Sequence, residues 1–264
     1  MTLALKIVIT PALIAIATLA GRRWGPSISG WLVGLPFTSG PVSLFLAFEQ
    51  GTAFAASAAA GSIAGAAAAS LFAVVYAGLA RRVAWPMTLA GASAVFLGGI
   101  ALIRMLPLTS DLPLPFGALY IATLAASVAA IAIVRPKATA TPAAAAPRWD
   151  LPARMITATA LVLVITTAAP LLGPQLTGLI TTYPIYASVL AAFAHAQRGP
   201  EAATLVVRGL CFGLLAFASF FFAIGALVDR LGIVVAFAAA IAAALAVQSL
   251  TLQRVRPGSA SPKA

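Results

Sequence analysis

Residues 30–41 read Gly-Trp-Leu-Val-Gly-Leu-Pro-Phe-Thr-Ser-Gly-Pro, and residues 178–188 read Gly-Leu-Ile-Thr-Thr-Tyr-Pro-Ile-Tyr-Ala-Ser. Each stretch places a proline and several hydroxyl side chains in the middle of a long apolar run. A proline inside a helix removes one backbone donor and frees a carbonyl in the preceding turn. In hydrocarbon that carbonyl needs a neighbouring helix, a hydroxyl or water as its partner. The two stretches therefore predict two interrupted helices in an apolar environment.

The composition of the whole chain agrees with a lipid environment. Of the 264 residues, 62% are hydrophobic and 8% are charged, and the mean hydropathy is +1.07. A soluble domain carries about a quarter charged residues, so this chain has too little polar surface to cover a globule in water. We predict an all-α, polytopic integral membrane protein whose main partner is the lipid bilayer.

Transmembrane helices require about 20 mostly apolar residues, and the chain contains nine runs of that kind. A linker rich in Ala, Thr and Pro, residues 138–147, separates the fifth run from the sixth. We expect residues 1–110 to hold spans one to four, 111–150 to hold span five and the linker, and 151–264 to hold spans six to nine and a polar tail. The predicted spans lie near 3–20, 28–49, 54–80, 84–106, 114–135, 153–171, 175–196, 203–228 and 231–252.

The Lys and Arg residues predict the orientation of the chain. With nine spans and the N-terminus outside, thirteen of the sixteen fall in inner segments, and only Lys6, Arg104 and Arg230 fall outside. Segments that stay in the cytoplasm carry such an excess of positive charge. The four tryptophans also fall at the inner edge, where an indole anchors well; they are Trp24, Trp31, Trp85 and Trp149. We predict an outer N-terminus and a cytoplasmic C-terminus.

The two halves of the chain repeat each other at an offset of 148 positions. Matches between Ala or Leu residues mean little in this composition, but matches between Gly and Pro residues are informative. The offset aligns Gly25-Pro26 with Gly173-Pro174, Gly30 with Gly178, Pro36 with Pro184, Gly51 with Gly199, and Gly61 and Gly65 with Gly209 and Gly213.

The repeat predicts two copies of a four-helix unit in opposite orientations. Five spans separate the start of the first copy from the start of the second, and an odd number reverses the direction across the bilayer. Span five then connects the two inverted copies. Inverted repeats with broken helices at corresponding positions are typical of secondary transporters, although a fold-level analogy does not establish a function.

The two interrupted helices supply the candidate substrate site. We predict a site near the bilayer midplane where the first interruption faces the second, built from Pro36, Thr38, Ser39 and Pro41 on one side and Tyr183, Pro184, Tyr186 and Ser188 on the other. The alternative is a pair of kinked helices that pack together, with the hydroxyls bonded back to nearby carbonyls.

Two G-x-x-x-G motifs, Gly61–Gly65 and Gly209–Gly213, lie in spans three and eight among many Ala and Ser residues. Small residues four positions apart let two helix backbones approach closely. We therefore predict that these glycines pack helices together. Whether the contact lies within one chain or between two copies stays open at this point, so a homodimer is one alternative.

Charged residues are scarce inside the predicted spans. No carboxylate occupies a mid-membrane position, so a coupled carrier would have to use Glu49 at the outer mouth or backbone carbonyls. His195, at the inner end of span seven, is a candidate gating residue or simply a polar helix end. Arg208 either contacts an anion in the cavity or extends its guanidinium to the inner headgroups.

Several function classes find no support in the sequence. The chain has one cysteine, Cys211, and one histidine, which argues against a disulfide framework and a metal site. No catalytic set or phosphate-binding loop can be assembled, so we expect no enzymatic activity and no cofactor. The net charge of +11 comes from basic residues between apolar runs, a pattern that does not favour nucleic acid as a partner.

Residues 177–202 contain a set of short motifs: Gly178-Leu179-Ile180, Pro184, Arg198-Gly199 and Glu201-Ala202. With this spacing, the stretch resembles the GlpM family of small bacterial inner-membrane proteins. The resemblance covers spans six to nine well and spans one to four more faintly. This chain differs because family members are single units, and because Thr181 stands where they tend to have a further proline. The resemblance implies a bacterial inner membrane and a loose link to envelope or polysaccharide physiology, without a substrate.

These observations favour a small secondary transporter or exporter of a small solute that the sequence does not identify. The alternative, from another functional class, is a membrane scaffold that does not transport and assists envelope or polysaccharide assembly. A dry interior packed with Ala and Gly would fit the scaffold, whereas a polar path that reaches both Pro36 and Pro184 would fit the transporter.

Overall fold

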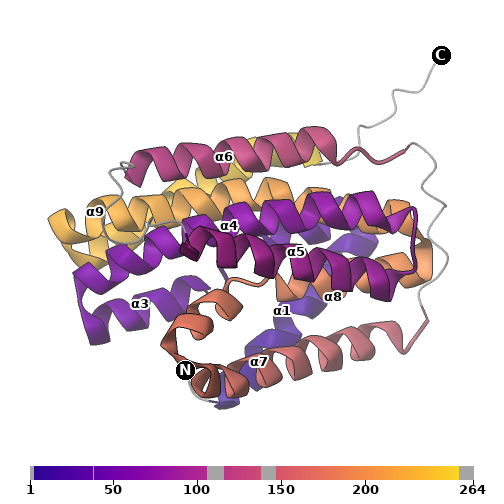
Figure 1. Ribbon diagram of the computed structural model, residues 1–264, viewed down its shortest axis with the longest axis horizontal. Coiled ribbons are helices and arrows are strands. Elements are labelled where there is room, and N and C mark those ends of the chain that lie inside the picture. Colours follow the sequence, from indigo (N-terminus) through magenta and orange to yellow (C-terminus); the bar gives the residue numbers. More distant parts are fainter. Residues whose placement is uncertain (1–2, 38, 106–115, 138–146, 256–264) are drawn as a thin grey trace.

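The computed structural model describes residues 3–37, 39–105, 116–137 and 147–255, and within these ranges the chain forms helices and no strand (Figure 1). The prediction of an all-α fold is therefore confirmed for the described residues. In chain order the helices are α1 (Leu3–Trp24), α2 (Pro26–Val33), α3 (Ser39–Gln50), α4 (Thr52–Ala80), α5 (Trp85–Met105), α6 (Phe116–Ile133), α7 (Asp150–Thr181), α8 (Ile185–Arg198) and α9 (Pro200–Val255).

Five of the described helices are long and apolar enough to cross a bilayer. The stretches that qualify are Ile7–Trp24, Thr52–Ala80, Trp85–Ile103, Phe116–Ile133 and Pro200–Val255, in α1, α4, α5, α6 and α9. Many large apolar side chains on their outer faces are exposed, including Ile121, Val234 and Leu250. Lipid is the solvent that such a surface requires, so the chain is a multi-pass membrane protein.

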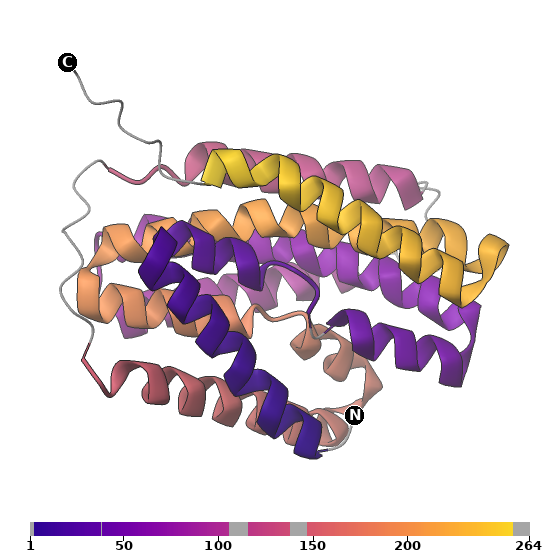
Figure 2. The same cartoon turned by 180° about the vertical axis from the view of Figure 1, so that it is seen from behind.

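Helix α9 is one continuous segment in sequence but two helices in space. Its 56 residues would measure roughly 84 Å if straight, which is far more than a bilayer core. At Gly232 the backbone leaves the helical region (φ 77°, ψ 170°), a conformation that suits glycine. The chain doubles back there, and the segment after Gly232 returns along the bundle (Figure 2). The bend lies at the start of predicted span 231–252, four residues after the end of predicted span 203–228.

Glycines with positive φ also separate other consecutive helices. Gly25 precedes α2, Gly51 precedes α4 and Gly199 precedes α9, with φ of 99°, 89° and 82°. Gly51 and Gly199 occupy equivalent positions at the 148-residue offset. Their ψ values of 175° and −179° are nearly the same. The two predicted copies therefore make the same backbone turn at this point.

Predicted spans two and seven are broken more completely than a kink requires. Span two is divided into the short helices α2 and α3, and span seven is divided between the end of α7 and α8. Both breaks lie about midway along the bundle (Figures 1 and 2). The prolines explain the breaks, because neither Pro36 nor Pro184 can donate the bond that would continue the preceding helix.

Helices α4 and α9 form the centre of the bundle. Their contact is the most extensive in the molecule, and α2 and α8 also pack on α9. The buried face of α4 carries small residues such as Ala66, Ala69 and Ala73 beside Phe72 and Tyr76. Small side chains allow the close helix approach that membrane interiors favour.

The predicted segments 1–110 and 151–264 do not form separate bodies. Helix α2 packs mainly on α9, α4 packs mainly on α9, and α1 packs on α7. Each of these contacts joins the first half of the chain to the second half. The core is therefore shared between the halves, and connecting helix α6 packs on both α4 and α9.

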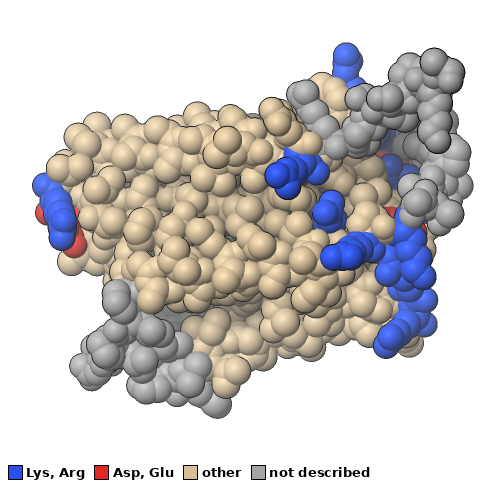
Figure 3. Space-filling model, turned by 90° about the horizontal axis from the view of Figure 1, so that it is seen from above, with Lys and Arg blue, Asp and Glu red and all other residues tan. Residues whose placement is uncertain are grey.

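Basic side chains gather at one end of the bundle (Figure 3). The C-terminal ends of α1, α4 and α8 and the starts of α7 and α9 meet there through ion pairs and hydrogen bonds. Trp24, Trp85 and Trp149 belong to these helix ends or the adjoining turns and are exposed. Trp31 is different, because it is buried and its indole N–H donates to Thr251 Oγ1 at 3.0 Å.

Candidate functional site

The first break follows α2. Gly34 N–H still donates to the Gly30 carbonyl at 3.2 Å, but Leu35 N–H turns to the Leu32 carbonyl at 3.1 Å. The Trp31 carbonyl thus loses the donor that a continuous helix would supply. The side-chain amide of Gln248, buried in α9, donates to that carbonyl at 3.2 Å. A neighbouring helix therefore satisfies a backbone group that the break releases.

The second break lies between α7 and α8. Pro184 is the N-cap of α8, with φ −77° and ψ 63°. The Pro184 carbonyl accepts both the backbone N–H and the side-chain hydroxyl of Ser188, each at 2.9 Å. Ser188 is buried, and its hydroxyl is bonded back to the helix as the alternative interpretation of the sequence expected.

Both breaks lie against a glycine of a long helix from the other half of the chain. A Cβ on Gly34 would lie 2.5 Å from the Cα of Gly213 in α9, and a Cβ on Gly65 in α4 would lie 2.7 Å from the Thr182 side chain. Residues 34 and 182 differ by 148 positions, and so do 65 and 213. The two contacts are thus equivalent under the 148-residue offset, and any larger side chain at Gly34, Gly65 or Gly213 would separate the helices.

The predicted packing glycines do not all make such contacts. A Cβ on Gly209 would overlap the Ser27 carbonyl, so Gly209, Gly65 and Gly213 all lie at close helix approaches. Gly61 is exposed, and no described residue lies within 4 Å of a Cβ placed on it.

Tyrosine hydroxyls of the second break reach into the first half of the chain. Tyr183 Oη and Ser93 Oγ of α5 share a hydrogen bond of 2.7 Å, and Tyr186 Oη donates to Thr10 Oγ1 of α1 at 3.4 Å. The Tyr183 ring also makes an edge contact with Phe96, with centroids 5.5 Å apart. Ser93 and Thr10 were not among the predicted site residues, because a single hydroxyl in an apolar run carries no distinctive pattern.

The predicted residues of the first break have varied environments. Pro36 and Ser39 are half-buried and Pro41 is exposed, whereas Thr38 lies outside the described residues. Gly40 N–H donates to the Pro36 carbonyl at 2.8 Å, which starts α3. The tyrosine hydroxyls of the second break bond to α5 and α1 rather than to these residues.

A row of aromatic rings leads from the second break to the basic end. Centroid distances are 6.0 Å from Tyr183 to Phe72, 5.8 Å from Phe72 to Tyr76 and 6.2 Å from Tyr76 to His195. Tyr76 is fully buried, and its hydroxyl has no partner among the described residues. The predicted gating residue His195 thus stands at one end of a path of rings that begins at the candidate site.

The other candidate gating residues lie apart from the breaks. Glu49 is exposed at the end of α3. The Arg208 guanidinium lies 5.3 Å from the centre of the Phe212 ring, and its Nε has no partner among the described residues. Among all the residues that the structure describes, no group of three or more His, Cys, Asp or Glu side chains is placed to hold a metal ion.

Asp150, between the linker 138–147 and predicted span 153–171, forms a buried polar cluster that the sequence did not reveal. Its side chain is 1% exposed and accepts hydrogen bonds from Arg22 at 2.8 Å, Arg154 at 2.8 Å and Gln197 at 2.6 Å. Burial acts to raise the pKa of the Asp150 carboxyl, but these hydrogen bonds outweigh it and hold the pKa below its ordinary value. The cluster joins α1 of the first half to α7 and α8 of the second.

A second ion pair at the same end joins α4 to α9. Arg81 donates to Glu201 through Nε at 2.7 Å and through Nη2 at 3.0 Å, and the backbone N–H of Lys137 donates to the same carboxylate at 2.8 Å. The hydrogen bond to Glu201 raises the pKa of Arg81 above its ordinary value. The spacing of four residues between Asp150 and Arg154 is a local signal for the first cluster, but Arg81 and Glu201 are too far apart in sequence to be paired by inspection.

Comparison with protein-family models, with curated proteins and with solved structures gives no match to this chain.

Proposed function

We propose that the chain is a small secondary transporter or exporter, with its substrate site at the breaks between α2 and α3 and between α7 and α8. The observation that carries the proposal is the matched position of the two breaks, each seated on a glycine of a central helix from the other half. Broken helices that meet at repeat interfaces form the substrate sites of many transporters.

The same contacts support an architecture of two inverted four-helix repeats with nine spans. The pairs Gly34–Gly213 and Thr182–Gly65 exchange under the 148-residue offset, as expected for halves related by a two-fold axis. The matching turns at Gly51 and Gly199 support the same relationship. Spans one to four would form the first copy, α6 the connector, and spans six to nine the second copy.

In this proposal the basic end faces the cytoplasm of a bacterial cell, and the membrane is the inner membrane. The excess of Lys and Arg at that end supports the orientation. The resemblance of residues 177–202 to the GlpM family is the ground for choosing the bacterial inner membrane. Reporter tags after residues 22 and 172 test the inverted arrangement, because they should be found inside and outside respectively. Tags on the same side would contradict it.

The groups around the breaks suggest how a solute would be bound. Tyr183, Tyr186 and Ser93 offer hydroxyls beside the second break. None of these groups carries a formal charge, so recognition would depend on hydrogen bonds. To admit a solute, the hydrogen bonds from Tyr183 to Ser93 and from Tyr186 to Thr10 would have to open.

Flux measurements on the purified chain in liposomes, with a panel of candidate solutes, test the proposal. Replacing Tyr183 by Phe should reduce the flux of a transported solute roughly fivefold, because one buried hydrogen bond is worth about 1 kcal/mol. Ser249→Ala is the matched control, since among the described residues this exposed hydroxyl bonds to its own helix, at the Leu245 carbonyl. Absence of flux for every solute, with folded wild-type protein, would count against transport.

The membrane scaffold remains the second candidate because Gly61 is exposed on α4. A small residue on an outer face can accept a partner helix or a second copy of the chain. Gly61→Leu should then abolish co-purification with a partner or disrupt a homodimer while leaving the monomer folded. Loss of cellular function in Gly61→Leu, with full function in Tyr183→Phe, would favour the scaffold over the transporter.

A further inference from the structure

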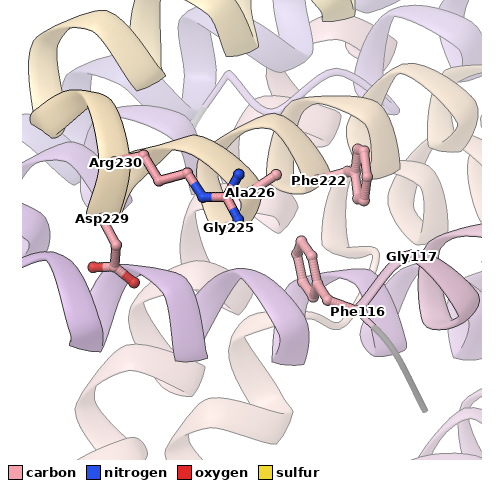
Figure 4. Close-up of a pocket in the computed structure, with 7 residues that line it drawn as sticks. All are labelled: Phe116, Gly117, Phe222, Gly225, Ala226, Asp229 and Arg230. Carbon is pink, nitrogen blue, oxygen red and sulfur yellow. The ribbon is translucent and has the colours of Figure 1, made fainter.

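A pocket of about 440 Å³ (Figure 4) lies where α6 begins and where α9 approaches its bend at Gly232, at the end of the bundle away from the basic cluster (Figure 1). Its walls combine aromatic rings, small residues and two opposite charges. The lining residues are Phe116, Gly117, Phe222, Gly225, Ala226, Asp229 and Arg230.

The apolar side of this pocket is built by stacked rings. Phe222 of α9 lies parallel to Phe116, with centroids 5.4 Å apart, and to Tyr120, with centroids 4.2 Å apart. Tyr120 is held in place by a hydrogen bond of 2.9 Å to Ser219. A Cβ on Gly225 would overlap the Phe116 ring, so glycine at this position lets the ring lie close to α9.

The polar side consists of Asp229 and Arg230, which project from the last turn before the bend (Figure 4). Both side chains are exposed, and neither has an ion-pair partner among the described residues. The Asp229 carboxylate and the Arg230 guanidinium thus line one pocket, and neither forms an ion pair with a described residue. The ligand that complements them carries an ammonium group and an acidic group on one small frame.

We propose that this pocket binds the headgroup of a zwitterionic phospholipid, a phosphatidylethanolamine in a bacterial membrane. Arg230 would donate to the phosphodiester, which guanidinium recognises well, and Asp229 would accept from the ammonium group. One acyl chain would then lie along the half-buried rings of Phe116 and Phe222, between α6 and α9. An anionic lipid fits less well because it leaves Asp229 without a cation. The proposal does not depend on transport.

Lipid binding to the full chain, purified in detergent and freed of lipid, tests the proposal. Native mass spectrometry with phosphatidylethanolamine and with phosphatidylglycerol should show stronger retention of the zwitterionic lipid. Asp229→Asn and Arg230→Gln should each weaken that retention roughly tenfold, as expected for loss of one charge-assisted hydrogen bond. Glu49→Gln is the matched control, because Glu49 is an exposed carboxylate at the end of α3 that does not line the pocket.

Three outcomes would overturn the proposal. Equal retention of both lipids would show that the charge pair does not select the headgroup. Unchanged retention in both pocket variants would place the bound lipid elsewhere on the molecule. Binding of soluble phosphoethanolamine with the affinity of the whole lipid would show that the ligand is a free zwitterion and that the rings contribute nothing through an acyl chain.

Discussion

Asp150 at the basic end accepts hydrogen bonds from Arg22, Arg154 and Gln197, whereas Asp229 at the opposite end has no ion-pair partner among the described residues. The two carboxylates also differ in burial, since the Asp150 side chain is 1% exposed and Asp229 lies on the surface. Ion pairs of the buried Asp150 therefore hold the helices together at one end of the bundle. At the other end, Asp229 and Arg230 line an open pocket and form no ion pair with a described residue.

This difference indicates at which end of the bundle the two halves of the chain are harder to separate. The basic end joins the halves twice, through Asp150 between α1 and α7 and through Arg81 and Glu201 between α4 and α9. If the halves rock against each other during transport, opening that end must break these pairs. Opening the other end breaks no ion pair of the described residues. In the proposed transporter, the basic end would therefore be the harder end to open.

The largest predicted effect is that of Asp150→Ala. This change leaves the Arg154 side chain, 5% exposed, without its carboxylate. Removing one partner of a buried ion pair costs about 3–5 kcal/mol. The free energy of unfolding, measured by denaturant titration in micelles, should fall by that amount.

Asp229→Ala is the control at the other end for this measurement. An exposed carboxylate without an ion-pair partner should contribute within about 0.5 kcal/mol of zero. Equal losses in the two variants would show that the ends are fastened to the same degree, and the comparison between them would then fail.

Much of the fold follows from the sequence because its main signals are local. Apolar length predicted the helices, and Pro36 and Pro184 predicted the interruptions in spans two and seven. The runs 203–228 and 231–252 also predicted that the chain turns back between two spans, but no local pattern identified Gly232 as the residue at the bend. Trp31 was expected at the membrane edge, and burial against Thr251 was unforeseen because no local pattern identifies a partner 220 residues away.

The site was less predictable because its contacts are long-range. The proline positions located the breaks, but not the partners Ser93, Thr10 and Gln248. Each is a single polar residue in an apolar helix, and many such residues only bond to their own backbone. Asp150 was overlooked because a carboxylate beside a linker resembles a solvated loop residue until the fold brings Arg22 and Gln197 to it.

A smaller effect is predicted when pH falls. Asp150 precedes predicted span 153–171, and its folded pKa lies below the ordinary value of 3.8. Its stabilisation is therefore fully present above about pH 3.8 and is lost as the pH falls through the lowered pKa. Asp150→Asn resembles the protonated carboxyl, so the stability gap between wild type and this variant should narrow in that range. A gap that stays constant down to pH 2 would show that the ionised carboxylate of Asp150 is not the stabilising form.

The smallest effect is predicted for the more exposed pair at the basic end. The Arg81 and Glu201 side chains are 32% and 15% exposed, so solvent screens their attraction. The ion pair is strengthened because two nitrogens of Arg81, Nε and Nη2, each donate to one oxygen of the Glu201 carboxylate. Glu201→Gln should lower the free energy of unfolding by about 1 kcal/mol. High salt should reduce that difference because it screens charges near the surface. Glu49→Gln is the control at the opposite end and should change stability little at any salt concentration. If Glu201→Gln has no effect even at low salt, the Asp150 cluster alone fastens the basic end, and the second link between the halves contributes no measurable stability.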